Sequence, residues 1–234
     1  MKLGIVGAMD VEVDFFKAEI EINSSYEQAG MTFYDGVFKG VEIILVKSGV
    51  GKVNSAICTQ ILINEFEVDQ IIFTGVAGAI DRRLEVGDIV VAESLIQHDF
   101  DARGFGYALG EIPGLGQVSF TADRKLVSLA KKAGRKVAAE KDINVYSGRV
   151  LSGDQFIASQ EKVIELQEGF NGYCTEMEGA ALAQVCFLNE IPFVVVRSIS
   201  DNADQEADYE FAEFAKKAAS NSYAIVAKMI SYLK

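Results

Sequence analysis

Charged side chains follow the most apolar strand that the sequence predicts. The segment FVVVRSISD places Arg197, Ser200 and Asp201 at the end of that strand. A strand this apolar is expected to be central and buried, where a charge needs a partner. The pattern allows two interpretations, a structural pair of Arg197 with Asp201 or a functional site. Desolvation at the end of such a strand would raise the pKa of Asp201.

A second acidic cluster precedes a helix of small residues in CTEMEGAALAQVC. Glu176 and Glu178 flank Met177 at the position where this helix should begin. Residues two apart do not share a helix face, so we expect at least one carboxylate to point away from the other's site. An acidic pair that leads into an apolar, alanine-rich helix is hard to explain as surface, which favours a functional interpretation.

Two further segments place candidate groups at strand ends. In GIVGAMDVEV a strand ends at Gly7 and Glu12 falls in the first helical turns, where the helix dipole alone explains an acidic residue better than a site does. In FTGVAGAI the small residues Gly75, Ala77 and Gly78 directly follow a predicted strand. They would let a flat ligand approach the backbone, although a tight packing turn explains them equally well.

Other familiar motifs are incomplete. The run Gly49-Val50-Gly51-Lys52 resembles the end of a P-loop, but it lacks the first glycine, and Val53 replaces the hydroxyl that would bind Mg²⁺. The only histidine, His98, is interpreted as structural. With three unclustered cysteines and one histidine, no common zinc site can be assembled, so we expect no metal.

The elements that must position these groups alternate between short apolar strands and helices. Strands are predicted over 3–7, 42–47, 70–74, 88–92, 144–151 and 193–199, and helices over 11–20, 52–66, 122–140, 178–189 and 209–233. This alternation predicts an α/β fold in one domain, residues 1–234, with a central mixed, mostly parallel sheet surrounded by helices. Ligands bind such sheets at the carboxyl ends of the strands, where the four segments lie. Residues 97–119 interrupt the alternation of strands and helices, which predicts a long functional or interfacial loop.

The composition excludes several classes of partner. The 234 residues include 22 basic and 34 acidic side chains, a net charge of −12. Because nucleic acid and anionic membranes attract basic surfaces, we expect neither as a partner. The chain has no apolar run near about 20 residues and no signal-peptide pattern. Its cysteines are odd in number and unclustered, which favours a cytoplasmic protein.

The chain resembles the purine nucleoside phosphorylase and hydrolase family in segments that occur in order along nearly its whole length: GIVGAMDVEV, KSGVGKVN, TGVAGA, QHDFDARGFGYALGEIPG, SGDQFI, EMEGAALAQVC and FVVVRSISDNAD. The match is closest to the hydrolase branch, whose members release adenine from 5′-methylthioadenosine and S-adenosylhomocysteine. The resemblance implies a nucleoside phosphorylase-like fold, a homodimer, a small nucleoside substrate, and hydrolysis of an N-glycosidic bond without metal or organic cofactor.

The resemblance also implies roles for individual residues. Glu12 matches the carboxylate that activates the attacking water, and Asp201 matches the acid that protonates adenine at N7, with Ser200 beside it. An Asp at this position favours 6-aminopurines, whereas an Asn would suit 6-oxopurines. Glu178 matches the group that binds the ribose hydroxyls. The other expected contacts are Met177 under the sugar, Phe156 and the backbone of Ile157 at the purine, Met9, Val50 and Phe211 around the 5′-alkylthio group, Arg197 near the water, Phe105 from the partner subunit, and Ala77, Gly78 and Glu176 in the same wall.

Two positions depart from the family pattern. Many members have Ser at the position of Val76, and phosphorolytic relatives use that Ser, with an Arg at the position of Phe73, to hold phosphate. Apolar residues at both positions favour water as the nucleophile. A phosphorylase of the same fold and a nucleosidase for aminodeoxyfutalosine remain alternatives. A non-catalytic nucleoside-binding protein is disfavoured, because binding alone needs neither Glu12 nor Asp201.

Overall fold

Two strands that are buried along their whole length form the centre of the molecule. β5 (Gln70–Ala79) and β10 (Phe193–Asp201) pair in parallel, and every residue of both strands is buried. Strands covered on both faces need near-continuous apolar side chains, which explains the runs QIIF and FVVV. The computed structural model describes residues 1–233.

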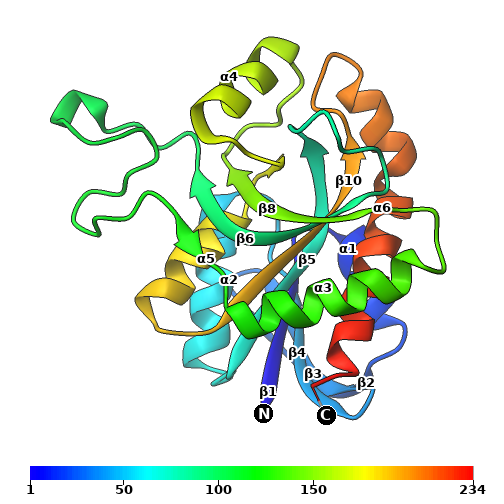
Figure 1. The fold of residues 1–234 in the computed structure, drawn as a ribbon. Coiled ribbons are helices and arrows are strands. Elements are labelled where there is room, and N and C mark those ends of the chain that lie inside the picture. The colour runs from blue at the N-terminus through cyan, green and yellow to red at the C-terminus, as the bar shows by residue number, and fades with distance from the viewer. Residues whose placement is uncertain (234) are drawn as a thin grey trace.

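β5 and β10 belong to a mixed sheet that turns back on itself (Figure 1). Its spatial order within residues 1–233 is β10, β6 (Ile89–Gln97), β8 (Val145–Ser152), β9 (Cys174–Glu176), β5, β1 (Lys2–Gly7), β4 (Val41–Lys47), β3 (Met31–Phe38) and β2 (Glu21–Gln28), with β7 (Phe120–Thr121) beside β6. Because β10 also pairs with β5, the first five strands close into a ring, and the others extend from it as an open sheet. Within the described chain, five strand pairs run parallel and five antiparallel, so the predicted mixed sheet is confirmed with more antiparallel pairing than the sequence pattern indicates.

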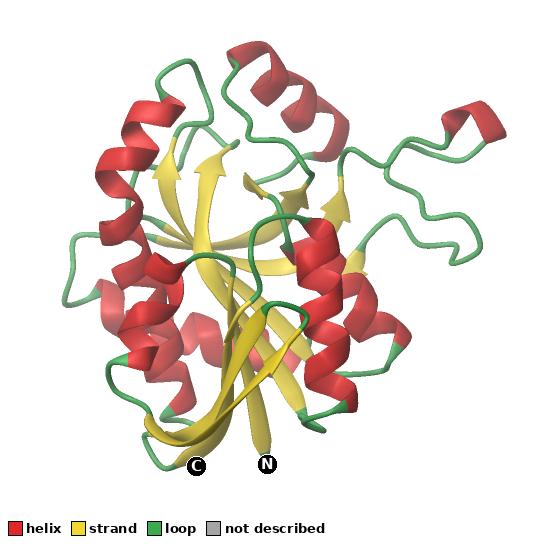
Figure 2. Ribbon diagram, turned by 180° about the vertical axis from the view of Figure 1, so that it is seen from behind, coloured by secondary structure: helices red, strands yellow, loops and turns green. Residues whose placement is uncertain are grey.

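Helices cover both faces of the sheet, as the two ribbon views show (Figures 1 and 2). They are α1 (Asp10–Lys17), α2 (Lys52–Asn64), α3 (Arg124–Ala138), α4 (Gln160–Phe170), α5 (Gly179–Leu188) and α6 (Ala207–Ile230). Helices α2 and α5 pack on one face, and α1, α3 and α6 pack on the other. Successive side chains of β4 point to opposite faces of the sheet. Ile44 and Val46 pack in the core on the side of α2 and α5, and Ile43 and Leu45 pack in the core on the side of α1, α3 and α6.

The structure extends two predicted strands toward the site. β5 continues to Ala79, so the expectation that Gly75, Ala77 and Gly78 follow the strand is wrong, because all three lie inside it. The extension is stabilised by pairing, since Gly78 lies opposite Thr175 of β9 while β10 runs along the other edge. β10 itself continues to Asp201 after an irregularity in its register with β5. The sequence pattern did not predict β2, β3, β7, β9 or α4.

The predicted long loop lies between β6 and β7 and projects away from the rest of the molecule (Figure 1, left). It contains a short 3-10 helix, Arg103–Phe105, and a bridge between Ile112 and Gln117. The side chain of Phe105 is 87% exposed. A large aromatic side chain this exposed on a projecting loop is available for contact with another molecule.

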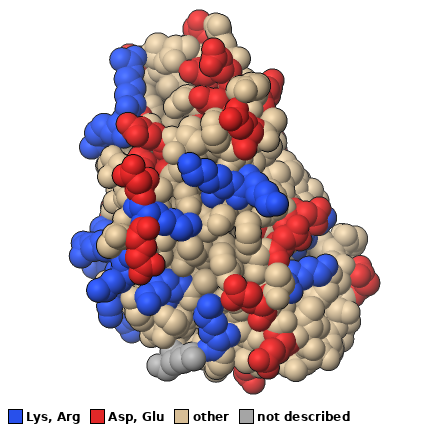
Figure 3. All heavy atoms as spheres, turned by 90° about the vertical axis from the view of Figure 1, so that its right-hand side faces the viewer, with Lys and Arg blue, Asp and Glu red and all other residues tan. Residues whose placement is uncertain are grey.

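Charged side chains of both signs are interspersed over the face shown in Figure 3. On this face, the Lys and Arg side chains are mixed with Asp and Glu and do not form the continuous positive surface that attracts a polyanion. No helix within residues 1–233 is both long enough and apolar enough to cross a membrane.

Candidate active site

A cavity of about 220 Å³ lies where β1 and β10 end and β5 passes between them. Its walls are formed by Ala8, Met9, Glu12, Val50, Val76, Ala77, Gly78, Gln155, Phe156, Ile157, Thr175, Glu176, Met177, Glu178, Ser200, Asp201 and Phe211. All the predicted site residues line this cavity except Arg197 and Phe105. The four sequence segments that carried the candidate groups therefore converge on one site.

Glu12 lies in the first turn of α1, and its side chain folds back over the end of β1. Oε2 accepts hydrogen bonds from the amides of Ala8 (2.6 Å) and Met9 (3.0 Å), and Oε1 accepts one from the amide of Val76 (2.9 Å). The carboxyl group reaches β5 because Gly75 has no side chain. A Cβ at Gly75 would overlap Glu12 Oε1 and lie 2.7 Å from Nη1 of Arg197.

Glu12 is 3% exposed, and burial raises its pKa above the ordinary value. The charge of Arg197 and the three amides favour the ionised form but offset the effect of burial only in part. A carboxylate with a raised pKa is a stronger base than a solvated one, and it can accept a proton from water more readily.

Asp201 lies at the end of β10, where the backbone irregularity turns its side chain into the cavity. Oδ2 accepts a hydrogen bond from Oγ of Ser200 (2.7 Å), and Oδ1 accepts one from the amide of Ala203 (3.0 Å). Burial raises the pKa of Asp201 despite these two hydrogen bonds. A Cβ at Gly78 would lie 2.7 Å from Oδ1, so this glycine lets the acid pack directly on β5.

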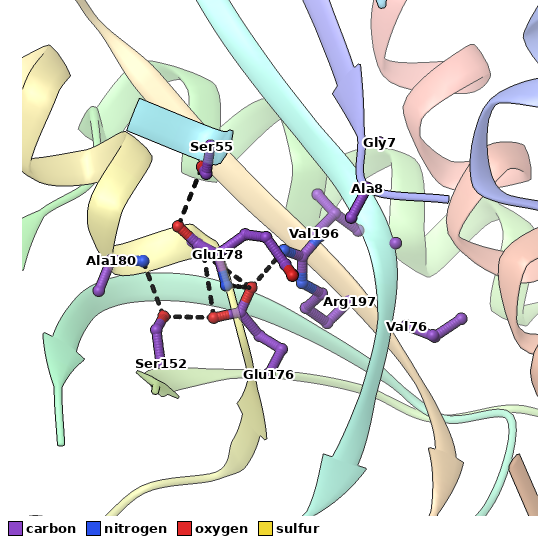
Figure 4. A network of polar contacts seen from close by, with 12 residues as sticks. Gly7, Ala8, Ser55, Val76, Ser152, Glu176, Glu178, Ala180, Val196 and Arg197 are labelled. Carbon is purple, nitrogen blue, oxygen red and sulfur yellow. Dashed lines mark hydrogen bonds and ion pairs between the residues drawn. The ribbon is translucent and has the colours of Figure 1, made fainter. Parts of the chain in front are cut away.

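Arg197 pairs with Glu176 and not with Asp201, so the structural Arg197–Asp201 pair weighed from the sequence does not form (Figure 4). The register of β10 shifts between Ile199 and Asp201. Such a bulge re-aims the side chain that follows it. Arg197 is 1% exposed and lies behind the cavity wall, with its Cζ 4.2 Å from the ring centre of Phe73. It is not among the residues that line the cavity, so its place among the substrate-binding residues stays a prediction.

Glu176 is held by a dense set of donors (Figure 4). Arg197 Nη2 and Ser152 Oγ donate to its two oxygens, and the amide of Gly179 donates at 2.8 Å and 3.0 Å. Ser152 Oγ in turn accepts from the amide of Ala180 at 2.7 Å. Burial alone would lower the pKa of Arg197, but the nearby carboxylates, led by Glu176, raise it, so the guanidinium remains charged.

Glu178 is the first residue before α5, and its carboxyl group has fewer partners. Oε1 accepts a hydrogen bond from the amide of Gly51 (2.8 Å), while burial and the charge of Glu176 raise the pKa of Glu178 to about 8. Both Glu176 and Glu178 line the cavity, so the expectation that one would point away is wrong. The argument from helical spacing does not apply, because Glu176 belongs to β9 and not to α5.

Sequence reasoning missed the contributions of Ala8, Ser152, Gln155 and Thr175. Ser152 and Gln155 lie in the segment SGDQFI, which matches the family, but the match predicts no role for either residue. The amide of Ala8 acts through the backbone, which leaves no signal in residue type. Within residues 1–233, no group of three or more His, Cys, Asp or Glu side chains is arranged to hold a metal ion.

His98, interpreted as structural, is 4% exposed and lies outside the cavity lining. Burial lowers its pKa, which favours a neutral imidazole. Gly153 provides the space for this ring, since a Cβ there would overlap it.

Comparison with known proteins identifies the family. Residues 2–231 match the family described as the phosphorylase superfamily. A 5′-methylthioadenosine/S-adenosylhomocysteine nucleosidase of Exiguobacterium sp. is 41% identical over 227 residues, which cover 97% of this chain and 96% of the relative.

Solved structures agree with this assignment. The nucleosidase of the same name from Colwellia psychrerythraea, in complex with adenine, has a TM-score of 0.95 at 41% identity and covers 100% of this chain and 96% of its own. A futalosine hydrolase of Helicobacter pylori has a TM-score of 0.92 at 37% identity, with 99% and 98% covered. The chain therefore belongs to the phosphorylase superfamily, and within it to the family of 5′-methylthioadenosine/S-adenosylhomocysteine nucleosidases, which are N-glycosyl hydrolases.

Proposed function

We propose that the chain hydrolyses the N-glycosidic bond of 5′-methylthioadenosine and S-adenosylhomocysteine and releases adenine. The observation that carries this proposal is that Glu12 and Asp201, two buried carboxyl groups with raised pKa values, line one cavity. A reaction that protonates a leaving group and activates water needs an acid and a base in the same site.

Asp201 is the proposed acid. Adenine leaves poorly as an anion, and protonation at N7 lets it leave as a neutral base. Burial raises the pKa of Asp201, which favours the protonated form more than in a solvated carboxyl group. The hydrogen bond from Ser200 and the amide of Ala203 fix the orientation of the group. One proton thus moves from Asp201 to N7 as the C1′–N9 bond breaks.

Glu12 is the proposed base. The departing adenine leaves positive charge on the sugar, and a water molecule adds to C1′ and gives one of its protons to Glu12. The three amides that bind the Glu12 carboxylate keep it in place while it accepts the proton. Arg197, charged and buried, contributes an electrostatic field that favours the ionised form of Glu12 before the reaction.

The rest of the lining provides contacts for the three parts of such a substrate. Glu178 has an acceptor oxygen for the ribose hydroxyls, and Met177 adjoins it. Phe156 and Ile157 form the proposed purine contacts. Met9, Val50 and Phe211 form an apolar wall suited to a 5′-alkylthio group.

The apolar surroundings of Glu12 favour water over phosphate as the nucleophile. The side chains of Val76 and Phe73 carry no group that could bind a phosphate oxygen. The buried Arg197 is already paired with Glu176 and stacked on Phe73.

We further propose that the chain acts as a homodimer in the cytoplasm, with Phe105 of each subunit closing the partner's cavity. Support comes from the exposure of Phe105 and from other large apolar side chains that are exposed, Val53 on α2 and Leu188 on α5. Helices α2 and α5 pack against each other. The free cysteines Cys58, Cys174 and Cys186 fit a reducing compartment.

A nucleosidase that acts on aminodeoxyfutalosine is the second candidate, supported by the likeness to the futalosine hydrolase. One assay separates the candidates: release of the free base from methylthioadenosine, adenosylhomocysteine, aminodeoxyfutalosine and inosine, each with and without phosphate. We expect adenine from the first two at rates that phosphate does not change. Turnover of aminodeoxyfutalosine alone would favour the second candidate, and phosphate dependence would indicate a phosphorylase.

A further inference from the structure

The run Gly49-Val50-Gly51-Lys52, which resembles the end of a P-loop, leads into α2 at the edge of the cavity. Helix N-termini attract anions, because their first amides are free and the helix dipole is positive there. Here carboxylates of the chain itself take that place. The amide of Gly51 donates to Glu178 Oε1 at 2.8 Å, and the amide of Lys52 donates to Asp154 Oδ1 at 2.8 Å.

The side chain of Lys52 also serves an internal partner. Its Nζ lies 2.6 Å from Asp99 Oδ1, and Asp99 Oδ2 accepts a hydrogen bond from the amide of Asp154 at 2.9 Å. Lys52, Asp99 and Asp154 therefore form a closed set of contacts, which we call the clamp. The side chains of Lys52 and Asp99 are each 17% exposed, so their ion pair is only weakly screened by water.

The clamp joins three segments that are remote in sequence. Lys52 begins α2, next to Gly51, whose φ of 99° favours glycine and whose added Cβ would lie 3.2 Å from Asp154 Oδ1. Asp154 lies two residues before Phe156, in the segment that lines the cavity. Asp99 stands at the start of the long loop that carries Phe105.

A second contact ties α2 to the same residue of the cavity. Ser55, one turn into α2, is fully buried and donates from Oγ to the backbone carbonyl of Glu178 at 3.1 Å (Figure 4). Glu178 is therefore held by α2 through both its side chain and its backbone. Any shift of the start of α2 would change the direction of the Glu178 carboxylate.

We propose that Lys52, Asp99 and Asp154 are positioning residues that fix the amide of Gly51 against Glu178 and hold the Asp154–Ile157 segment against the base. This inference rests on the proposed function, since it assigns Glu178 to the ribose and Phe156 and Ile157 to the purine. The lysine of the P-loop-like run thus orders the site and does not bind a phosphate.

The test uses the full-length protein with Lys52→Met, Asp99→Asn, and both changes together. Lys131→Met is the matched control, since Lys131 on α3 forms an exposed ion pair with Glu93 of β6. We expect each clamp variant to raise KM for methylthioadenosine about tenfold, with kcat changed less than KM. The double variant should lose no more than the worse single variant, because contacting groups are not additive. Lys52→Arg, which can still pair with Asp99, should recover KM to within about threefold of the wild type.

The affinity for adenine, measured by calorimetry, separates this proposal from the proposed function. If the wild type binds adenine but does not cleave methylthioadenosine, the substrate assignment fails, while about tenfold weaker adenine binding by Lys52→Met would still support the clamp. The clamp is overturned if the variants match the wild type in KM and adenine affinity, or if they lose only thermal stability. A wild type that neither cleaves nor binds adenine overturns both proposals.

Discussion

Glu12 and Asp201 both contact strand β5, at points that are three residues apart along that strand. The carboxyl group of Glu12 accepts from the amide of Val76 and lies over Gly75, whereas Oδ1 of Asp201 lies over Gly78. At roughly 3.3 Å per residue, these two anchor points on β5 are about 10 Å apart. Both carboxyl groups line the same cavity. The glycines of β5 thus leave space for the proposed acid and the proposed base to pack on this strand.

Asp201→Asn is expected to abolish the release of adenine. An amide cannot donate the proton that N7 needs, so we expect kcat for methylthioadenosine to fall by at least about 10²-fold to 10⁴-fold. The exposed Asp208 provides the control, and Asp208→Asn should leave kcat unchanged. Near-normal turnover by Asp201→Asn, measured as adenine released under saturating substrate, would contradict the assignment of the acid.

Glu12→Gln is expected to separate binding from chemistry. The Gln side chain can keep an acceptor for the amides of Ala8 and Met9, but it cannot take a proton from water. We expect the dissociation constant for methylthioadenosine to stay within a few-fold of the wild type, while single-turnover hydrolysis falls by about 10²-fold or more. Asp10→Asn, an exposed change on the same helix, serves as the control. Lost binding with unchanged turnover of bound substrate would refute the role of Glu12.

Glu178→Gln is expected to stabilise the protein at alkaline pH while it weakens ribose binding. The pKa of Glu178 rises from its usual 4.5 to about 8 in the folded chain, so the folded state holds a proton that the unfolded state releases. Stability therefore falls as the pH rises from about 4.5 to about 8, and Gln removes this loss. At pH 9 we expect Tm of the variant to exceed that of the wild type by about 3 °C or more, with a smaller difference at pH 5. The exposed Glu168→Gln should show no such pH dependence, and an equal Tm difference at both pH values would contradict the prediction.

Val76→Ser tests whether the family's serine is needed at this position. Val76 binds Glu12 through its backbone amide, and its side chain is buried against Ala218 and Ala219 of α6. Since the variant keeps the amide, we expect kcat within about tenfold of the wild type, no dependence on phosphate, and a loss of about 1 to 3 kcal/mol in the free energy of unfolding. Val76→Ala, which removes methyl groups without adding a hydroxyl, separates the effect of packing from that of polarity. Phosphate-dependent turnover by Val76→Ser would show that Val76 alone excludes phosphate.

The strands and helices that could be predicted are those whose residue pattern reflects one dominant force. β4 and most of β10 are apolar runs, and α3 has an apolar stripe, so burial determines both kinds of element. β2 is exposed at nearly all its residues and gives no such signal. The end of β5 was missed because its glycines and alanines have little intrinsic preference for strand. Pairing with β9 and β10 holds them extended.

The site was predictable in its residues but not in all its contacts. Glu178 and Asp201 stood out because acidic groups near apolar segments need a reason to be buried. Glu12 was assigned a role only from the family resemblance. The partner of Arg197 could not be predicted by the same argument from burial. Residues four apart on a regular strand share a face, which favours Asp201 as the partner. The bulge after Ile199 removes that relation, and Glu176 from a separate strand takes the place.

The central claim is that a water molecule activated by Glu12 attacks the sugar while Asp201 protonates the base. Its most direct test is the hydrolysis of methylthioadenosine in H₂¹⁸O at saturating phosphate, followed by mass spectrometry of the sugar product. We predict adenine and methylthioribose that carries one ¹⁸O atom at C1. Methylthioribose 1-phosphate without the label, or no adenine at all, would contradict the account.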